Sequence, residues 1–136
     1  MNLKKLYATN YINIALVIIR LWLGVVMFMY STDYLFGGKV PELVSFLESL
    51  NWPMPKVMAY TSQIVELVAS VLILLGVRFG AFMLSVNMLM AVLFVHNGLI
   101  FTEAETPFNY FLFALILSLC GMGKVSLDSL LFKNNR

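Results

Sequence analysis

The sequence predicts an all-α membrane protein, a bundle of four transmembrane helices with a short interfacial helix between helices 1 and 2. The chain has 136 residues, of which 61% are hydrophobic and 12% are charged. A soluble domain is about 45–50% apolar and about 25% charged, and a chain this short could not bury the excess. The alternation typical of transmembrane β-strands is absent, so helices must satisfy the backbone in lipid.

Four apolar stretches are the predicted transmembrane spans: residues 12–35, 56–77, 79–101 and 107–125. A helix needs about 20 mostly apolar residues to cross a hydrocarbon core about 30 Å thick. The apolar run of the fourth stretch, residues 107–123, is short for a span, and its predicted end at residue 125 assumes that Val125 and its neighbours extend the helix. The basic start of the chain is typical of a signal peptide, but no small-residue cleavage site follows, so we predict that it is retained. With no internal repeat or linker, residues 1–136 are predicted to form a single membrane domain.

The basic residues predict the orientation. Seven of the nine fall on one side of the predicted membrane: Lys4, Lys5, Arg20, Arg78, Lys124, Lys133 and Arg136. Lys39 and Lys56 fall on the other side. The positive-inside rule therefore places both termini in the cytoplasm. Because topology explains the charge asymmetry, the net charge of +2 gives no indication of a nucleic-acid partner.

The segment between the first two spans predicts a short interfacial helix. Gly37 and Gly38 end the first helix, and Pro41 suits the first turn of a new one. One apolar face follows, made by Leu43, Phe46, Leu47 and Leu50. Trp52 closes the segment as an interfacial anchor.

Glu66 is the polar residue that most strongly suggests function. It lies about ten residues from either end of its predicted span, too deep for a short side chain to reach water. It must be neutral, paired or beside a wet cavity. Ser62, Gln63 and Ser70 share its region of the helix. We therefore favour a functional role for Glu66 over a structural one.

The other intramembrane polar residues have two open interpretations. Arg20 could act at a site or extend toward the cytoplasmic headgroups. His96 could be functional or merely interfacial. Several others are predicted to link helices, at about 0.6 kcal/mol each: Asn13, Ser31, Ser62, Ser70 and Asn87. The candidates for ligand binding or proton handling are Glu66, His96, Arg20, Gln63, Asn109 and Tyr30.

Familiar catalytic motifs are missing from the sequence. Cys120 is the single cysteine, which excludes a disulfide relay within the chain. One histidine and one cysteine make neither a haem pair nor a convincing metal site. There is no phosphate-binding glycine loop and no nucleophile elbow. The sequence predicts no metal and no covalently bound cofactor.

Five pieces of the chain, in this order and spacing, resemble the DoxX family of small four-helix membrane proteins of bacteria and archaea. They are "RLWLG" (20–24), "NWP" (51–53), Glu66 followed by "LVASVLILLGVRFGA" (67–81), His96, and "GMGKVSLD" (121–128). The resemblance covers nearly the whole chain. Where family members often carry a lysine at the end of the first span, this chain has Tyr30, Ser31 and Tyr34.

The resemblance implies a multi-pass protein of the cytoplasmic membrane, often one subunit of a larger assembly. Some relatives are named as the small subunit of a thiosulfate:quinone oxidoreductase, and others accompany thiol- or superoxide-handling proteins. We expect a redox-associated subunit that binds quinone or an accessory oxidoreductase partner. Glu66, His96 and Arg20 would then handle protons or hydrogen-bond the quinone carbonyls.

Besides membrane lipid, the expected partner is another protein or a further copy of the chain. The chain is not expected to be an active enzyme alone. One alternative is a non-catalytic subunit that anchors or assembles a membrane complex. Another is a small proton-coupled transporter, although no broken-helix pair or inverted repeat supports it.

Overall fold

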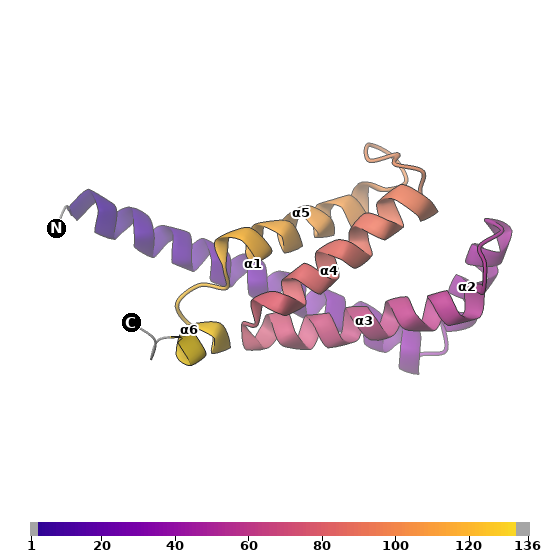
Figure 1. Cartoon of the computed structure of the whole chain (residues 1–136), viewed down its shortest axis with the longest axis horizontal. Coiled ribbons are helices and arrows are strands. Elements are labelled where there is room, and N and C mark those ends of the chain that lie inside the picture. The colour runs from indigo at the N-terminus through magenta and orange to yellow at the C-terminus, as the bar shows by residue number, and fades with distance from the viewer. Residues whose placement is uncertain (1–2, 133–136) are drawn as a thin grey trace.

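A computed structural model describes residues 3–132, and every regular element in that range is helical. The elements are α1 (Leu3–Phe36), α2 (Val40–Ser49), α3 (Pro55–Leu75), α4 (Arg78–Met90), the π-helix η1 (Ala91–Val95), α5 (Glu105–Cys120) and α6 (Leu127–Phe132). Helix α3 packs against α1 and α4, and α4 packs against α5. Both ends of the chain lie at the end of the bundle that carries α6, and α2 lies at the opposite end (Figure 1). We call these the α6 end and the α2 end.

Three helical segments are long and apolar enough to cross a membrane: Asn10–Phe36, Pro55–Leu75 and Arg78–Val95. The third is α4 continued by η1. Helix α5 is equally apolar but has only 16 residues. Large apolar side chains such as Ile18, Trp22 and Phe82 are more than half exposed on these helices, as expected for a surface that contacts lipid.

The centre of the bundle is a small apolar core. Leu23, Ile73, Leu84 and Leu117 are fully buried, one from each of α1, α3, α4 and α5. A Cβ atom on Gly24 would lie 2.7 Å from the Leu74 side chain. The absence of a side chain at Gly24 therefore lets α1 approach α3 closely.

Two helices end before the limits of the predicted spans. The third predicted span runs to residue 101, but the helix ends at Val95, and Asn97 and Gly98 have positive φ angles. The fourth predicted span runs to residue 125, but α5 ends at Cys120, where Gly121 has a φ of 95°. Val125 lies in irregular chain and does not extend the helix.

The short helix α2 covers the α2 end of α3. It begins after a two-glycine turn and carries proline in its first turn. Val40 and Leu47 are buried against Ala59 of α3. Just before α2, an exposed ion pair joins Lys39 to Asp33 of α1, and this hydrogen bond raises the pKa of Lys39.

At the α6 end, the C-terminal segment packs onto the turn between α3 and α4. The Arg78 N–H, at the start of α4, donates to the Asp128 carboxylate at 2.7 Å. An acidic side chain at a helix N-terminus satisfies a free N–H and complements the helix dipole. A Cβ atom on Gly76 would lie 2.5 Å from the Ser126 side chain, and Gly76 has a φ of 83°. Glycine is therefore required at this turn for both space and conformation.

Candidate functional site

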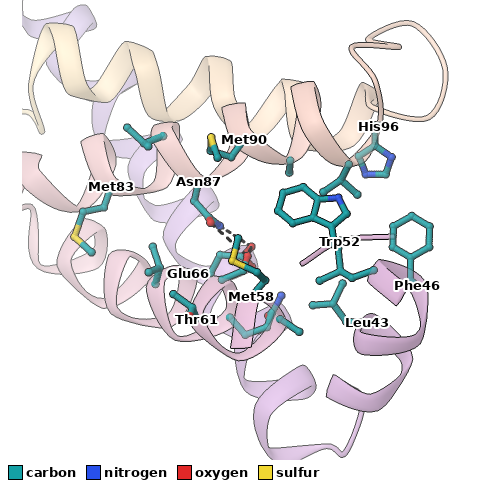
Figure 2. Close-up of a pocket in the computed structure, with 18 of the residues that line it drawn as sticks. Leu43, Phe46, Trp52, Met58, Thr61, Glu66, Met83, Asn87, Met90 and His96 are labelled. Atoms are coloured by element: carbon teal, nitrogen blue, oxygen red, sulfur yellow. Dashed lines mark hydrogen bonds between the residues drawn. The ribbon is translucent and has the colours of Figure 1, made fainter. Parts of the chain in front are cut away.

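A cavity of about 540 Å³ lies between α2, α3, α4 and η1. Its lining is mostly apolar, with one polar group of side chains on α3 and α4 (Figure 2). The apolar part includes Leu43, Phe46, Trp52, Met58, Phe82 and Met83. The polar part comprises Ser62, Gln63, Glu66 and Asn87, with His96 at the α2 end.

Glu66 is 9% exposed and is held by a side chain of the neighbouring helix. The Asn87 amide donates from Nδ2 to Glu66 Oε1 at 2.9 Å, and the two side chains face one another across the α3–α4 interface (Figure 2). The Ser62 hydroxyl lies 3.5 Å from the same carboxyl oxygen and 3.3 Å from Asn87 Oδ1. The single proton of the Ser62 hydroxyl can go to either acceptor, so the Asn87 amide is the main donor that fixes the carboxyl group in the cavity wall.

Two polar groups in this wall lack partners within the described part of the chain. The second carboxyl oxygen of Glu66, Oε2, accepts no hydrogen bond there. Gln63 is 6% exposed, and its buried Oε1 has no partner either. Gln63 Oε1 has almost no accessible surface, so Glu66 Oε2 is the unpaired atom of this wall that a ligand could reach without a change of rotamer.

Aromatic side chains close the α2 end of the cavity. The rings of Phe46 and His96 lie 6.2 Å apart, and Trp52 meets Phe94 edge-on at 6.4 Å. These contacts hold α2 and the loop after it against η1. The π-helix places His96 directly after its last residue, with the His96 N–H donating to the Ala91 carbonyl at 3.1 Å. Such π-turns are frequent at functional sites.

The cavity opens toward the lipid. Phe79, Phe82 and Val86 line it and are also 61%, 54% and 47% exposed on the outer surface of α4. Helix α4 belongs to a segment long and apolar enough to cross the membrane. This side of the cavity therefore borders a surface expected to contact lipid.

Arg20 lies outside this cavity. Its side chain is 6% exposed, and Nη1 donates to the carbonyls of Met122 and Val125 at 3.0 and 2.5 Å. The guanidinium thus ties α1 to the segment between α5 and α6. It neither reaches the headgroups as an exposed side chain nor pairs with Glu66.

Two other predicted candidates also lie elsewhere. Tyr30 lines a second cavity of about 690 Å³, together with Trp22 of α1 and Tyr110 of α5. Asn109 is exposed near the start of α5 and lines neither cavity. Of the six candidates, the structure brings together Glu66, Gln63 and His96.

Asn87 and Ser62 were predicted to link helices, and this is confirmed, because their hydrogen bonds join α3 to α4. The prediction did not identify the carboxyl group of Glu66 as the linked group. The contact between Asn87 and Glu66 could have been found from their positions in the sequence. Glu66 and Asn87 lie equally far along the chain from the turn at Gly76 and Val77. In an antiparallel helix pair with equal rise per residue, such positions lie at the same level. Trp52 and Phe46, predicted to lie at the membrane surface, also line the cavity.

No group of three or more histidine, cysteine, aspartate or glutamate side chains suited to a metal ion occurs among the described residues. Cys120, at the end of α5, is exposed.

The comparison with protein families matches the DoxX model over residues 15–97. The chain belongs to the DoxX family. The match includes Glu66, Gln63, Asn87 and His96 and stops before the "GMGKVSLD" segment, which therefore lies outside it. Together with the long apolar helices, family membership makes this a multi-pass membrane protein, and DoxX proteins are often associated with redox systems. Neither the curated proteins nor the solved structures gave a match.

Proposed function

We propose that this DoxX protein is a membrane subunit that binds quinone on behalf of a redox complex. The observation that carries the proposal is the lipid-accessible cavity in which a buried carboxyl group and a buried amide face a largely apolar space. A quinone has the matching chemistry, because it joins a ring bearing two oxygens to an apolar tail.

The cavity residues fit such a ligand in size and polarity. A volume of about 540 Å³ is within the usual range for small-molecule sites, about 300–1,000 Å³. The open oxygen of Glu66 would bond one ring oxygen, and the Gln63 amide, after a rotation of its terminal group, would donate an N–H to the other. Phe79, Phe82 and Met83 would contact the tail along α4. Quinone, when bound, supplies reversible transfer of electrons and protons, and the protein supplies binding, orientation and proton exchange.

The electrons would reach the site through an accessory oxidoreductase partner. The chain carries no redox cofactor motif or cysteine pair. We therefore assign the DoxX chain a role within a membrane complex and expect no turnover by the chain alone. An assembly subunit without a ligand is the competing interpretation, and the experiment below separates the two.

We propose four membrane crossings, by α1, α3, α4 with η1, and α5, in the cytoplasmic membrane. Helix α2 would lie at the outer surface, and residues 1–136 would form one domain. The even number of crossings agrees with both chain ends lying at the α6 end of the bundle (Figure 1). Reporter fusions at Lys39 and at the carboxyl terminus should report opposite sides of the membrane, with the terminus cytoplasmic. Reports from the same side would overturn this topology.

The quinone proposal is tested by mild purification followed by mass-spectrometric identification of bound lipids and proteins. We expect quinone to copurify with the wild-type chain and to be lost from a Gln63→Leu, Glu66→Leu double variant. A Tyr30→Phe variant, altered in the second cavity, is the matched control and should retain it. Recovery of a stoichiometric protein partner with no quinone would instead identify an assembly subunit.

A further inference from the structure

We infer that Glu66 distinguishes the oxidised from the reduced ligand through a single proton, so that the affinities for quinone and hydroquinone change in opposite directions with pH. This inference rests on the proposed quinone site. It concerns a property of that site which quinone binding does not require.

The geometry leaves one oxygen of Glu66 for the ligand. The Asn87 amide directs its N–H donor at Oε1 at 2.9 Å, so that oxygen accepts in either protonation state. If the carboxyl group carries a proton, the proton must therefore reside on Oε2. The oxygen available to the ligand is a donor when Glu66 is protonated and an acceptor when it is ionised.

The two redox forms of the ligand need opposite states of this oxygen. A quinone carbonyl can only accept, so it pairs with protonated Glu66. A hydroquinone hydroxyl can donate, so it pairs with the carboxylate in a strong charge-assisted bond. Each complex therefore contains the same hydrogen bond with the proton on a different atom.

The thermodynamic linkage between proton binding and ligand binding gives the size of the pH dependence. In the limit where each form binds one protonation state, the ratio of hydroquinone to quinone affinity is proportional to the ratio of ionised to protonated Glu66. That ratio rises about tenfold per pH unit, whatever the pKa of the free site. If quinone also binds ionised Glu66, or hydroquinone also binds protonated Glu66, the slope is smaller.

Gln63 should interact with the two ligand forms differently from Glu66. Its amide has both a donor and an acceptor end, and a rotation of the terminal group presents either one. It can therefore serve a quinone carbonyl and a hydroquinone hydroxyl equally. Gln63 should contribute to the affinity for both forms and leave the pH slope unchanged.

His96 is the other titratable side chain in the cavity lining, and it sits among aromatic rings at the α2 end. The remaining charged groups described on α1 to α4 do not line the cavity: Lys4, Arg20 and Asp33 of α1, Glu42 and Glu48 of α2, Lys56 of α3, and Arg78 of α4. The described tyrosines of these helices do not line the cavity either. A variant of His96 is therefore the essential control.

The test uses the full-length protein in lipid nanodiscs and calorimetric titration without oxygen, from about pH 5.5 to pH 8. The two probes are a decyl-substituted 1,4-benzoquinone and its hydroquinone, whose hydroxyls stay protonated in this range. In the wild type, we expect the affinity ratio to rise at least about fivefold per pH unit, toward the tenfold limit. Glu66→Gln should bind both probes with a ratio independent of pH. Gln63→Leu should weaken both and keep the slope, and His96→Asn should also keep it.

A pH-independent ratio in the wild type would overturn the inference and leave the quinone proposal standing. A slope that survives in Glu66→Gln and vanishes in His96→Asn would also overturn it, because His96 would then carry the proton. Absence of binding by either probe at every pH would overturn the quinone proposal itself, and the inference with it.

Discussion

Each end of the bundle contains a buried ionisable side chain, and the two differ in their hydrogen-bond partners. Toward the α6 end, Arg20 is enclosed by the backbone and donates to the carbonyls of Met122 and Val125. Toward the α2 end, Glu66 is fixed through one oxygen and presents the other to a cavity that opens to lipid. The first arrangement joins segments of the chain, and the second keeps one carboxyl oxygen free for a ligand.

This contrast shows why burial alone does not identify a functional charge. Both side chains lie deep in apolar surroundings, where an unpaired charge is costly. Each also keeps an unpaired polar atom: Arg20 Nε is buried without a partner among the described residues, and Glu66 Oε2 accepts no hydrogen bond there. They differ in that Glu66 lines the cavity and Arg20 does not, and this distinguishes a binding site from an internal link.

The largest structural effect is expected for Arg20→Met. The substitution removes two hydrogen bonds from a charged donor and frees the C-terminal segment from α1. The free energy of unfolding should fall by about 2–3 kcal/mol. Thermal unfolding in detergent measures the change, with Lys4→Met, an exposed residue of the same helix, as the control. An unfolding temperature equal to that of the wild type would show that Arg20 does not hold this segment.

Glu66→Gln should separate function from structure. The amide retains an oxygen that accepts from Asn87, so abundance and fold should match the wild type. Loss of the titratable proton should lower the activity of the assembled complex about a hundredfold. This is the lower end of the rate enhancement that a general acid or base usually provides. Complementation of a deletion strain measures the activity, and immunoblotting measures the abundance of the protein. Glu66→Leu should impair both, because Asn87 then loses its acceptor.

Full complementation by Glu66→Gln at normal abundance would reduce Glu66 to a packing residue. It would also remove the contrast with Arg20, because both side chains would then serve only the fold.

The smallest effect is expected for Asn87→Leu, which leaves Glu66 in place but removes its nearest donor. Stability should fall by about 0.6 kcal/mol, the average for polar contacts between membrane helices. If the carboxyl group is positioned less firmly, ligand affinity should fall about threefold. Ser85→Ala is the matched control, because Ser85 is buried on the same helix and bonds only within it. Equal effects of the two variants on ligand affinity would contradict a positioning role for Asn87.

The apolar helices and the burial of Glu66 could be predicted from the sequence, because hydropathy and depth in a span are local properties. The contact between Arg20 and the C-terminal segment could not, since its partners are carbonyls about a hundred residues away. Tyr30 and Asn109 show a second limit. Polarity marks a residue as unusual in a membrane helix, but rotation of that helix decides which surface it faces.

The π-helix Ala91–Val95 has a consequence for how the chain can vary in length. An α-helix turns by about 100° per residue, so one extra residue in its regular part rotates everything after it. A π-turn accommodates one extra residue without this rotation, so deleting one residue from Ala91–Val95 should restore a regular helix and leave His96 facing Phe46. Deleting one residue from the regular part of α4 would instead rotate His96 away from Phe46 and the cavity, so the direction of the His96 ring depends on the length of α4 and not on the presence of the wide turn.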